Sequence, residues 1–276
     1  YDRLVGSEMC IRDRLQGVAT AANGDVWIAD NTANHMIQFP GGDYTKGKRH
    51  TIAGLQAPFG VAVDAQNRVW VSSSYNNKLT VFPGDAPDQA KTIEVNLGGR
   101  GVAVDSTGHV WIAQQSNSPQ GALPPGAKMP PNIPANAPQP KTIMEEFEAG
   151  AEYLLTNPNI TQTGMVGLIS PDMKVVQQNI AKGTAYIPWG VSVDGNDNVW
   201  VGNLYGQSLT HICGVNPANC PEGKTTGDVI HNYQSGVIQM TTDVIVDDAG
   251  NLWSANNWFD GEVVINPTYQ GRTSTF

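Results

Sequence analysis

Polar side chains that could bind a ligand follow five short apolar runs of the chain, each at the point where the run ends. They are amides, hydroxyls and aromatic rings, with few charges among them. Amides donate and accept hydrogen bonds and aromatic rings stack, so this mixture suits a neutral polar ligand such as a sugar or a peptide. The alternative is that they are ordinary loop residues, because Asn and Ser favour turns. The candidate ligand-binding residues are Asn31, Tyr75, Asn76, Gln114, Gln115, Asn203, Tyr205, Asn257 and Trp258.

Carboxylates are scarce in these segments. General acid–base catalysis needs a carboxylate or a histidine in a cleft, and Asp30 and Asp260 are the catalytic candidates. The sequence holds no Gly-x-Ser-x-Gly nucleophile elbow, no His-Glu-x-x-His zinc motif, no phosphate-binding loop and no dinucleotide-binding fingerprint. These residues leave open whether the protein is an enzyme.

The elements that must position these side chains belong to an internal repeat. Segment 60–71, Gly-Val-Ala-Val-Asp-Ala-Gln-Asn-Arg-Val-Trp-Val, occurs in five versions, and each has a tryptophan ten residues after its start. A fixed period of this kind determines the architecture. The versions start at Gly17, Gly60, Gly101, Gly190 and Asp243, and their tryptophans are Trp27, Trp70, Trp111, Trp200 and Trp253.

Each version of the repeat predicts a series of short strands. The first strand ends at an aspartate, replaced by Ala21 in the first version, and the second strand carries the tryptophan. A third strand and a weaker fourth follow, as in 78–82 and 91–95. Four short strands in about 40 residues are typical of a propeller blade. We therefore predict an all-β fold, a β-propeller of four-stranded blades with five blades visible, and expect six in the native gene.

The repeated aspartates and tryptophans have sufficient structural roles. A carboxylate at Asp64, Asp105, Asp194 or Asp247 can accept backbone N–H bonds of its turn. A Gly, Asn or Asp follows three residues later, and Gly or Asn there tolerates a positive φ. The tryptophans are interpreted as packing between blades. Neither residue type is a candidate for catalysis.

An insertion interrupts the third blade. The starts of the third and fourth versions are 89 residues apart, which is about twice the spacing of the others. Region 119–140 is rich in Pro, which disfavours strands, and 142–155 has the apolar spacing and capping box of a short helix. We place the insertion, residues 116–164, between the second and third strands, where it could cover the ligand face. Residues 15–276 then form one domain, and residues 1–14, which match no part of the repeat, are interpreted as a non-native extension.

The pattern Gly-Val-Ala-Val-Asp-x-x-Gly-x-Val-Trp-Val resembles the NHL repeat and its relatives, the streptogramin (virginiamycin B) lyases and the gluconolactonases. The resemblance covers residues 15–276 and implies a propeller. As an alternative to simple binding, it implies a metal-dependent hydrolase or lyase with Ca²⁺ or Mg²⁺ at the channel mouth. Gluconolactonases hold the cation with a glutamate, an asparagine and an aspartate, and the positions available here are Asp30, Asn203 and Asn256. No glutamate starts an inner strand, and no Glu-x-His arrangement of the lyase type is present.

Composition and cysteine spacing restrict the environment and the partners. Cys213 and Cys220 bracket a short loop with Gly, Pro and Asn, which predicts a local disulfide typical of oxidising compartments, with two unpaired thiols as the alternative.

No apolar run reaches the roughly 18 residues of a membrane helix. A net charge of −9 removes the attraction to nucleic acid. We expect a monomer in the periplasm or outside the cell that binds a small polar molecule or a protein, and the Pro-rich insertion is an alternative docking segment for a protein partner.

Overall fold

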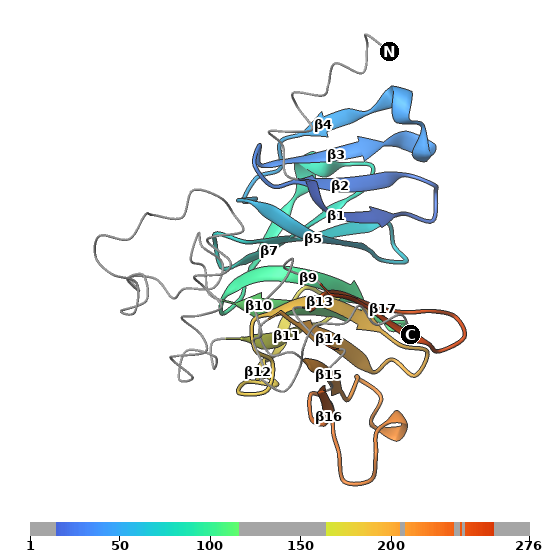
Figure 1. The fold of residues 1–276 in the computed structure, drawn as a ribbon. Coiled ribbons are helices and arrows are strands. Elements are labelled where there is room, and N and C mark those ends of the chain that lie inside the picture. Colours follow the sequence, from blue (N-terminus) through green and yellow to red (C-terminus); the bar gives the residue numbers. More distant parts are fainter. Residues whose placement is uncertain (1–14, 116–163, 205–207, 235–237, 239–240, 257–276) are drawn as a thin grey trace, which may run out of the picture. The chain divides into compact units, whose positions relative to one another are not determined.

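The computed structural model describes residues 15–115, 164–204, 208–234, 238 and 241–256. In these residues the protein consists of β-strands joined by turns, and the helical segments are single 3₁₀ turns (Figure 1). The all-β prediction is confirmed. No helix in the described ranges is long and apolar enough to cross a membrane.

The strands form separate sheets in chain order, which is the arrangement of propeller blades. Four sheets have four strands each, and the fifth has two described strands, so the predicted four-stranded blade is confirmed in four sheets. The strands are β1 (Leu15–Thr20), β2 (Val26–Asp30), β3 (His35–Phe39) and β4 (Lys48–His50); β5 (Pro58–Val63), β6 (Arg68–Ser73), β7 (Lys78–Pro83) and β8 (Lys91–Glu94); β9 (Gly98–Val104), β10 (Val110–Gln115), β11 (Met165–Ile169) and β12 (Val175–Ile180); β13 (Pro188–Val193), β14 (Val199–Asn203), β15 (Ser208–Ile212) and β16 (Val229–Gln234); and β17 (Thr241–Val246) and β18 (Leu252–Asn256).

The third sheet joins strands from the two sides of the predicted insertion. β10 and β11 are neighbours in one sheet, although Gln115 ends the first and Met165 begins the second. The Pro-rich region 119–140, the helix predicted over 142–155 and the extension 1–14 lie outside the described residues.

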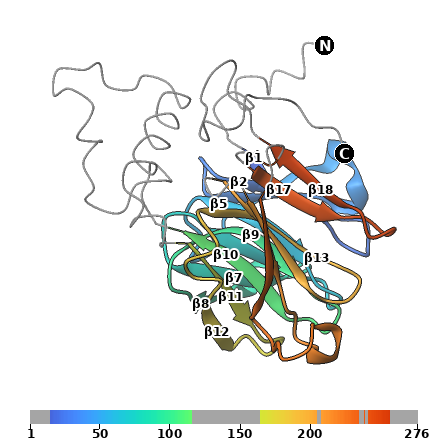
Figure 2. The same cartoon turned by 60° about the horizontal axis from the view of Figure 1, so that its bottom comes forward.

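The chain divides into two compact units, Tyr1–Ile112 with Gly167–Gln178, and Ala113–Val166 with Asn179–Phe276. The first unit contains β1 to β9, and the second contains β13 to β18, of which β13, β17 and β18 are labelled in Figure 2. The strands β10, β11 and β12 are divided between the two units. The single domain over 15–276 stays a prediction.

The aspartate of each repeat builds the turn between the first two strands. Oδ1 of Asp64 accepts the backbone N–H groups of Gln66 and Arg68 at 3.0 and 2.9 Å, and its Oδ2 accepts the indole Nε1–H of Trp70 at 2.8 Å. Asp105, Asp194 and Asp247 accept the indole N–H of their own tryptophans at 3.1, 3.0 and 2.9 Å. One carboxylate thus fixes the turn and the tryptophan together, which confirms the structural role of these aspartates.

The first repeat lacks this carboxylate. Ala21 occupies the position, and its turn keeps the same backbone bonds, with Gly24 N–H donating to the Ala21 carbonyl at 2.9 Å. Trp27 is fully buried, and its Nε1 has no hydrogen-bond partner in the described part of the chain. The exception read from the sequence therefore leaves a buried donor unsatisfied, which costs about 1–3 kcal/mol.

In the first unit the tryptophans fill the space between successive sheets. Trp27 in β2 meets Phe82 in β7 edge to face, with ring centroids 5.3 Å apart. Trp70 in β6 packs in one cluster with Val102 and Ile169 of the third sheet. Burial of each such side chain contributes about 1.5–3 kcal/mol. Packing between sheets is therefore confirmed for these tryptophans, whereas Trp253 in the second unit is 50% exposed.

The glycine that starts a repeat allows neighbouring sheets to approach closely. A Cβ added at Gly60 would lie 2.2 Å from the carbonyl oxygen of Arg100 in β9. The register of β5 against β6 shifts between Pro58 and Val61, so a bulge surrounds this glycine. No larger residue fits there without displacing the backbone of the next sheet.

Candidate functional site

The second strand of every sheet carries a polar residue at its last or next-to-last position, at the end opposite the aspartate turn. These residues are thirteen positions after the repeat start, and four of the five are fully buried. They pair with the start of the inner strand, as Asp30 does with Leu15 and Asn203 with Pro188. We call this position the strand-end position. Its residues are Asp30, Ser73, Gln114, Asn203 and Asn256.

In the first unit, side chains at the strand ends hold the connection between two sheets. Asn31 donates through Nδ2 to the Pro58 carbonyl at 3.1 Å, and Asn76 donates through Nδ2 to the Gly54 carbonyl at 3.2 Å. The backbone N–H of Ser74 donates to the Ala57 carbonyl at 3.0 Å. The loops 31–34 and 74–77 and the connection 54–58 therefore share one end of these sheets.

This connection includes backbone in the left-handed region. Ala57 has φ 48°, and Asn34 Oδ1 accepts its N–H at 2.6 Å. In the second unit, Ile187 has φ 51°, and its carbonyl accepts the N–H of Leu204 at 3.0 Å. For a β-branched residue this conformation is an outlier, and such outliers cluster at functional sites. The same end of the sheets thus carries strain in both units.

Three buried oxygen atoms at the strand ends of the first unit have no hydrogen-bond partner among the described residues: Asp30 Oδ2, Ser74 Oγ and Asn76 Oδ1. Asp30 is fully buried, and its other oxygen accepts the Ala33 N–H at 3.1 Å. A buried polar atom left unsatisfied costs about 1–3 kcal/mol, and more when it carries charge. Such atoms in a native fold call for a ligand, a water or an ion.

Arg100, in the inner strand β9, is a buried cation that the sequence reasoning missed. It is 4% exposed, its guanidinium carbon lies 5.0 Å from the Phe59 ring centroid, and Nη1 donates to the Gly99 carbonyl at 3.2 Å. Burial lowers the pKa of Arg100 to about 10, and Tyr75 opposes that shift. Arg100 therefore stays charged at neutral pH. The available signal was a charged residue inside a strand of Gly and Val.

In the second unit, Asn203 is fixed by hydroxyl groups of the neighbouring strand. Its Nδ2 donates to Ser208 Oγ at 3.0 Å and to Thr210 Oγ1 at 2.9 Å. Its Oδ1 is buried without a partner among the residues that the structure describes. Asn256 Oδ1 accepts the Thr241 hydroxyl at 3.1 Å. Asn203 thus offers an unused oxygen, and the oxygen of Asn256 is already engaged.

Asp243 is a second residue that the sequence reasoning missed. It stands where the other four repeats have glycine, in the inner strand β17. Desolvation raises the pKa of Asp243, and the hydrogen bond from the Val244 N–H at 2.9 Å opposes this shift only in part. A carboxyl with a raised pKa can exchange a proton closer to neutral pH. The available signal was the break in the glycine pattern.

The predicted site residues have different outcomes. Asn31, Asn76 and Asn203 are hydrogen-bonded at strand ends as described above, Tyr75 is 44% exposed, and Gln114 and Gln115 are buried at the end of β10. The predicted residues Tyr205, Asn257, Trp258 and Asp260 lie outside the described residues.

Two of the three predicted metal ligands have an oxygen atom without a hydrogen bond among the described residues. Asp30 Oδ2 and Asn203 Oδ1 are buried oxygens with no hydrogen bond, and oxygen atoms are the ligands that Ca²⁺ and Mg²⁺ prefer. Asp30 belongs to the first unit, and Asn203 and Asn256 belong to the second. Within the described ranges, no group of three or more His, Cys, Asp or Glu side chains is placed to hold a metal ion. The donor atoms of Asp30 and Asn203 fit a hard cation, and the three-residue site stays a prediction.

The predicted disulfide is not formed, because Cys213 and Cys220 are both free thiols. Cys213 is buried at the end of β15, and desolvation together with the Cys220 side chain raises the pKa of its thiol to about 12. The thiolate is the reactive form of cysteine. The buried thiol is thus kept protonated, which corresponds to the alternative of two unpaired thiols.

Known structures share this fold. Virginiamycin B lyase from Staphylococcus aureus matches with a TM-score of 0.60 and 12% identity, over 88% of this chain and 64% of that chain. A gluconolactonase from Xanthomonas campestris matches with a TM-score of 0.57 and 17% identity, over 88% of this chain and 70% of that chain. A chain of a nidogen–laminin complex matches with a TM-score of 0.57 and 13% identity, over 89% of this chain and 73% of that chain.

No protein-family model and no curated protein matches the chain. The chain spans 64% of the length of the virginiamycin B lyase chain that it matches. At these identities the likeness concerns the fold alone, and it agrees with the resemblance read from the repeat. The chain has the β-propeller fold found in these lyases and gluconolactonases.

Proposed function

We propose that this propeller binds a small neutral polar ligand at the strand ends. The observation that carries the proposal is the set of buried oxygens without partners, Asp30 Oδ2, Ser74 Oγ and Asn76 Oδ1. Each of them accepts hydrogen bonds, so the complementary ligand presents several donors, as the hydroxyl groups of a sugar or the amides of a peptide do. Tyr75, which is 44% exposed beside Ser74 and Asn76, offers a ring face for stacking.

Thermal unfolding with a panel of neutral saccharides and short peptides tests this proposal. A ligand at 100 times its Kd adds about 2.7 kcal/mol of stability, which raises the Tm by roughly 5–11 °C. Asp30→Asn keeps the oxygen that accepts the Ala33 N–H and replaces Oδ2 by a donor, so it should abolish the shift. Asp88→Asn, at an exposed carboxylate in the 3₁₀ turn Pro87–Gln89, is the matched control and should keep the shift. An equal shift in both variants would contradict the proposal.

A metal-dependent lactonase or lyase activity is the second candidate. It is favoured by the unused oxygens of Asp30 and Asn203 and by the raised pKa of Asp243. Similar folds include virginiamycin B lyase and a gluconolactonase. In this function, Asp30, Asn203 and Asn256 would hold Ca²⁺ or Mg²⁺, which supplies Lewis acidity toward a carbonyl oxygen. Asp243 would hold or release a proton at its carboxyl group.

Metal dependence separates the two candidates. The metal-dependent enzyme would be supported if lactone hydrolysis disappeared with EDTA and returned with Ca²⁺ or Mg²⁺. Adding either ion should then also raise the Tm. A Tm increase with saccharides or peptides that EDTA leaves unchanged would support binding alone. The location outside the cytoplasm, the monomeric state and protein docking by the Pro-rich insertion stay predictions.

A further inference from the structure

Two side chains that stand opposite each other at the end of the first sheet each have an unused hydrogen-bonding atom. Asp30, the last residue of β2, pairs directly with His35, the first residue of β3. Residues paired in this way point to the same face of the sheet, with Cβ atoms about 4.5–5.5 Å apart. Asp30 Oδ2 and His35 Nδ1 are buried and have no hydrogen-bond partner among the residues that the structure describes. The pair is therefore open to a third group that contacts both atoms.

The equivalent pair of the fourth sheet is closed. Asn203 holds the strand-end position of β14 and pairs with Ser208, the first residue of β15. Its Nδ2 donates to Ser208 Oγ at 3.0 Å, so these two side chains bind each other. In the first sheet a carboxylate and an imidazole replace the amide and the hydroxyl, and the bond between the two side chains is lost.

Hydrogen bonds fix the loop that joins Asp30 to His35. Asp30 Oδ1 accepts the Ala33 N–H at 3.1 Å, and Asn31 Nδ2 donates to the Pro58 carbonyl at 3.1 Å. The carboxylate is thus held by one oxygen while the other stays unused. Such preorganisation lowers the entropic cost of binding a ligand.

The chemistry of the two unused atoms favours hydroxyl groups as their partners. A carboxylate oxygen only accepts hydrogen bonds, whereas Nδ1 of a neutral imidazole accepts or donates according to its tautomer. A hydroxyl both donates and accepts, so it matches Asp30 and either tautomer of His35. An amide N–H of a peptide only donates and matches one tautomer. Two hydroxyls on neighbouring carbon atoms are spaced to contact two side chains that stand directly opposite each other.

We propose that Asp30 and His35 together bind a vicinal diol of a saccharide. One hydroxyl donates to Asp30 Oδ2, and the neighbouring hydroxyl forms a hydrogen bond with His35 Nδ1. This inference rests on the proposed function and narrows its ligand from sugars or peptides to sugars. His35, which is not among the candidate residues read from the sequence, becomes a specificity-determining residue.

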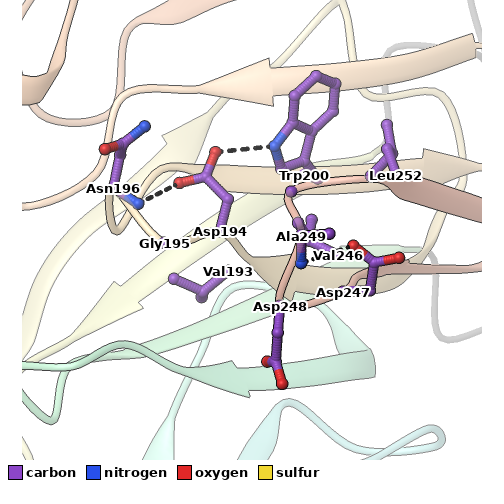
Figure 3. A pocket seen from close by; sticks show the side chains of 11 residues that line it. Val193, Asp194, Gly195, Asn196, Trp200, Val246, Asp247, Asp248, Ala249 and Leu252 are labelled. Atoms are coloured by element: carbon purple, nitrogen blue, oxygen red, sulfur yellow. Dashed lines mark hydrogen bonds between the residues drawn. The ribbon is translucent and has the colours of Figure 1, made fainter.

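A cavity of about 660 Å³ in the second unit is the competing location for a polar ligand. It lies between the turn that joins β13 to β14 and the turn that joins β17 to β18 (Figure 3). The aspartates of these turns, Asp194 and Asp247, each accept two backbone N–H groups and an indole N–H. Their oxygens are therefore already used, in contrast to Asp30 Oδ2.

A metal ion is the competing occupant of the pair, because carboxylate and imidazole both bind transition metals. Zinc sites take about three or four protein ligands. The described part of the chain holds no group of three or more His, Cys, Asp or Glu side chains placed to bind a metal ion. A diol needs only two partners and fits Asp30 and His35 better.

Calorimetric titration of the full chain is the first test. The probes are the saccharide that gives the largest Tm increase and its deoxy analogues, each lacking one hydroxyl. His35→Phe keeps a ring and removes Nδ1, so it should weaken binding of the parent saccharide about tenfold. One deoxy analogue should bind the unsubstituted protein equally weakly and lose nothing further in His35→Phe, because its missing hydroxyl is the one that His35 binds.

Two variants are the controls for this titration. His35→Asn places an amide near the position of Nδ1 and should restore most of the affinity. His109→Phe is the matched histidine variant, because His109 Nδ1 already forms a hydrogen bond with Thr107 Oγ1 at 2.8 Å, and it should keep the full affinity.

The outcomes separate this inference from the proposed function. The diol site is overturned, and the proposed function stands, if only peptides raise the Tm or if His35→Phe binds the saccharide as tightly as the unsubstituted protein. Both fail if neither saccharides nor peptides raise the Tm. A Tm increase with Zn²⁺ that Asp30→Asn and His35→Phe both remove would also overturn the diol site, because the pair would then hold a metal ion.

Nitrogen NMR of the imidazole rings tests the contact without a substitution. A saturating amount of the saccharide should shift the Nδ1 resonance of His35, because a hydrogen bond forms there. The resonances of His50, whose Nε2 already lies 3.0 Å from Gln38 Oε1, should stay unchanged. An unchanged His35 resonance at saturation would overturn the proposal, since a water molecule would then fill the pair permanently.

Discussion

The buried indole of Trp27 can be given the partner that the other four tryptophans have. We predict that Ala21→Asp stabilises the protein when it is made in an Asp25→Asn background. The second change is needed because Asp25 already accepts Gln38 Nε2–H at 2.9 Å and the Gly41 N–H at 2.8 Å, and a second carboxylate nearby would be repelled. The fifth sheet is the template for this pair of changes. There Asn251 follows Asp247 by four residues, as residue 25 follows residue 21, and its Nδ2 donates to Asp247 at 3.0 Å.

The magnitude follows from the unsatisfied donor. A buried N–H without a partner costs about 1–3 kcal/mol, and part of the gain is offset by desolvation of the new carboxylate. In the sheet of Trp70, Asp64 is compensated by two backbone N–H groups, the Trp70 indole and the Arg68 guanidinium, whose Nε donates to Oδ2 at 2.6 Å. At Ala21 the same backbone turn is present without such a cation. We expect a net gain of about 1–2 kcal/mol, or a Tm increase of roughly 2–8 °C.

Denaturation of four variants measures this gain. The Ala21→Asp step is made in the Asp25→Asn background, once with Trp27 and once with Trp27→Phe, which keeps an aromatic ring and removes the N–H. The gain should be present with Trp27 and should largely vanish with Phe. An equal gain in both backgrounds would refute the reasoning, because the new carboxylate would then act on the turn alone.

Three further predictions follow from the same geometry. Gly60→Ala should prevent folding or lower the Tm strongly, because its Cβ would lie 2.2 Å from the Arg100 carbonyl oxygen. Gly195→Ala, whose Cβ would have nothing within 4 Å, should change the Tm little, and similar Tm changes for both variants would contradict the close approach at Gly60. The Trp253 indole and the Asn251 amide lower the pKa of Asp247 from 3.8 to about 2. The stability that this carboxylate contributes is therefore complete above about pH 4 and is lost as the pH falls through 2. Asp247→Asn should reduce the pH dependence of the free energy of unfolding in that range, and an unchanged pH dependence would count against this role. Maleimide at pH 8 should label Cys220 much faster than Cys213, whose thiol pKa is raised to about 12, and equal rates by peptide mapping would contradict the burial of Cys213.

The fold was predictable because the information that specifies it is local and repeated. The aspartate, the positive-φ turn residue and the tryptophan lie within one hairpin, so ten residues of sequence predict their contact. Asp64 and Trp70 show this at 2.8 Å. The strands on the two sides of the predicted insertion were predictable for the same reason, since β10 continues the repeat pattern and β11 resumes it.

The polar strand ends could be located from the sequence, and a ligand site at them stays a prediction. Asn and Ser after a strand look like loop residues, and only the structure distinguishes buried Asp30 and Ser74 from half-exposed Tyr75. The hydrogen bonds of the Asn31 and Asn76 side chains depend on the connection 54–58, which is distant in sequence. Arg100 and Asp243 were missed because their burial arises from contacts between sheets. The predicted disulfide between Cys213 and Cys220 was wrong, because the composition of the loop does not reveal that the Cys213 thiol is buried.

A crystal structure of the full chain with the saccharide or peptide that gives the largest Tm increase tests the central claim most directly. The account predicts that a donor atom of that ligand lies within about 3.2 Å of Asp30 Oδ2, with Ser74 or Asn76 also in contact. It would be contradicted if Asp30 Oδ2 accepted a hydrogen bond from a side chain of the protein itself while the ligand was bound elsewhere.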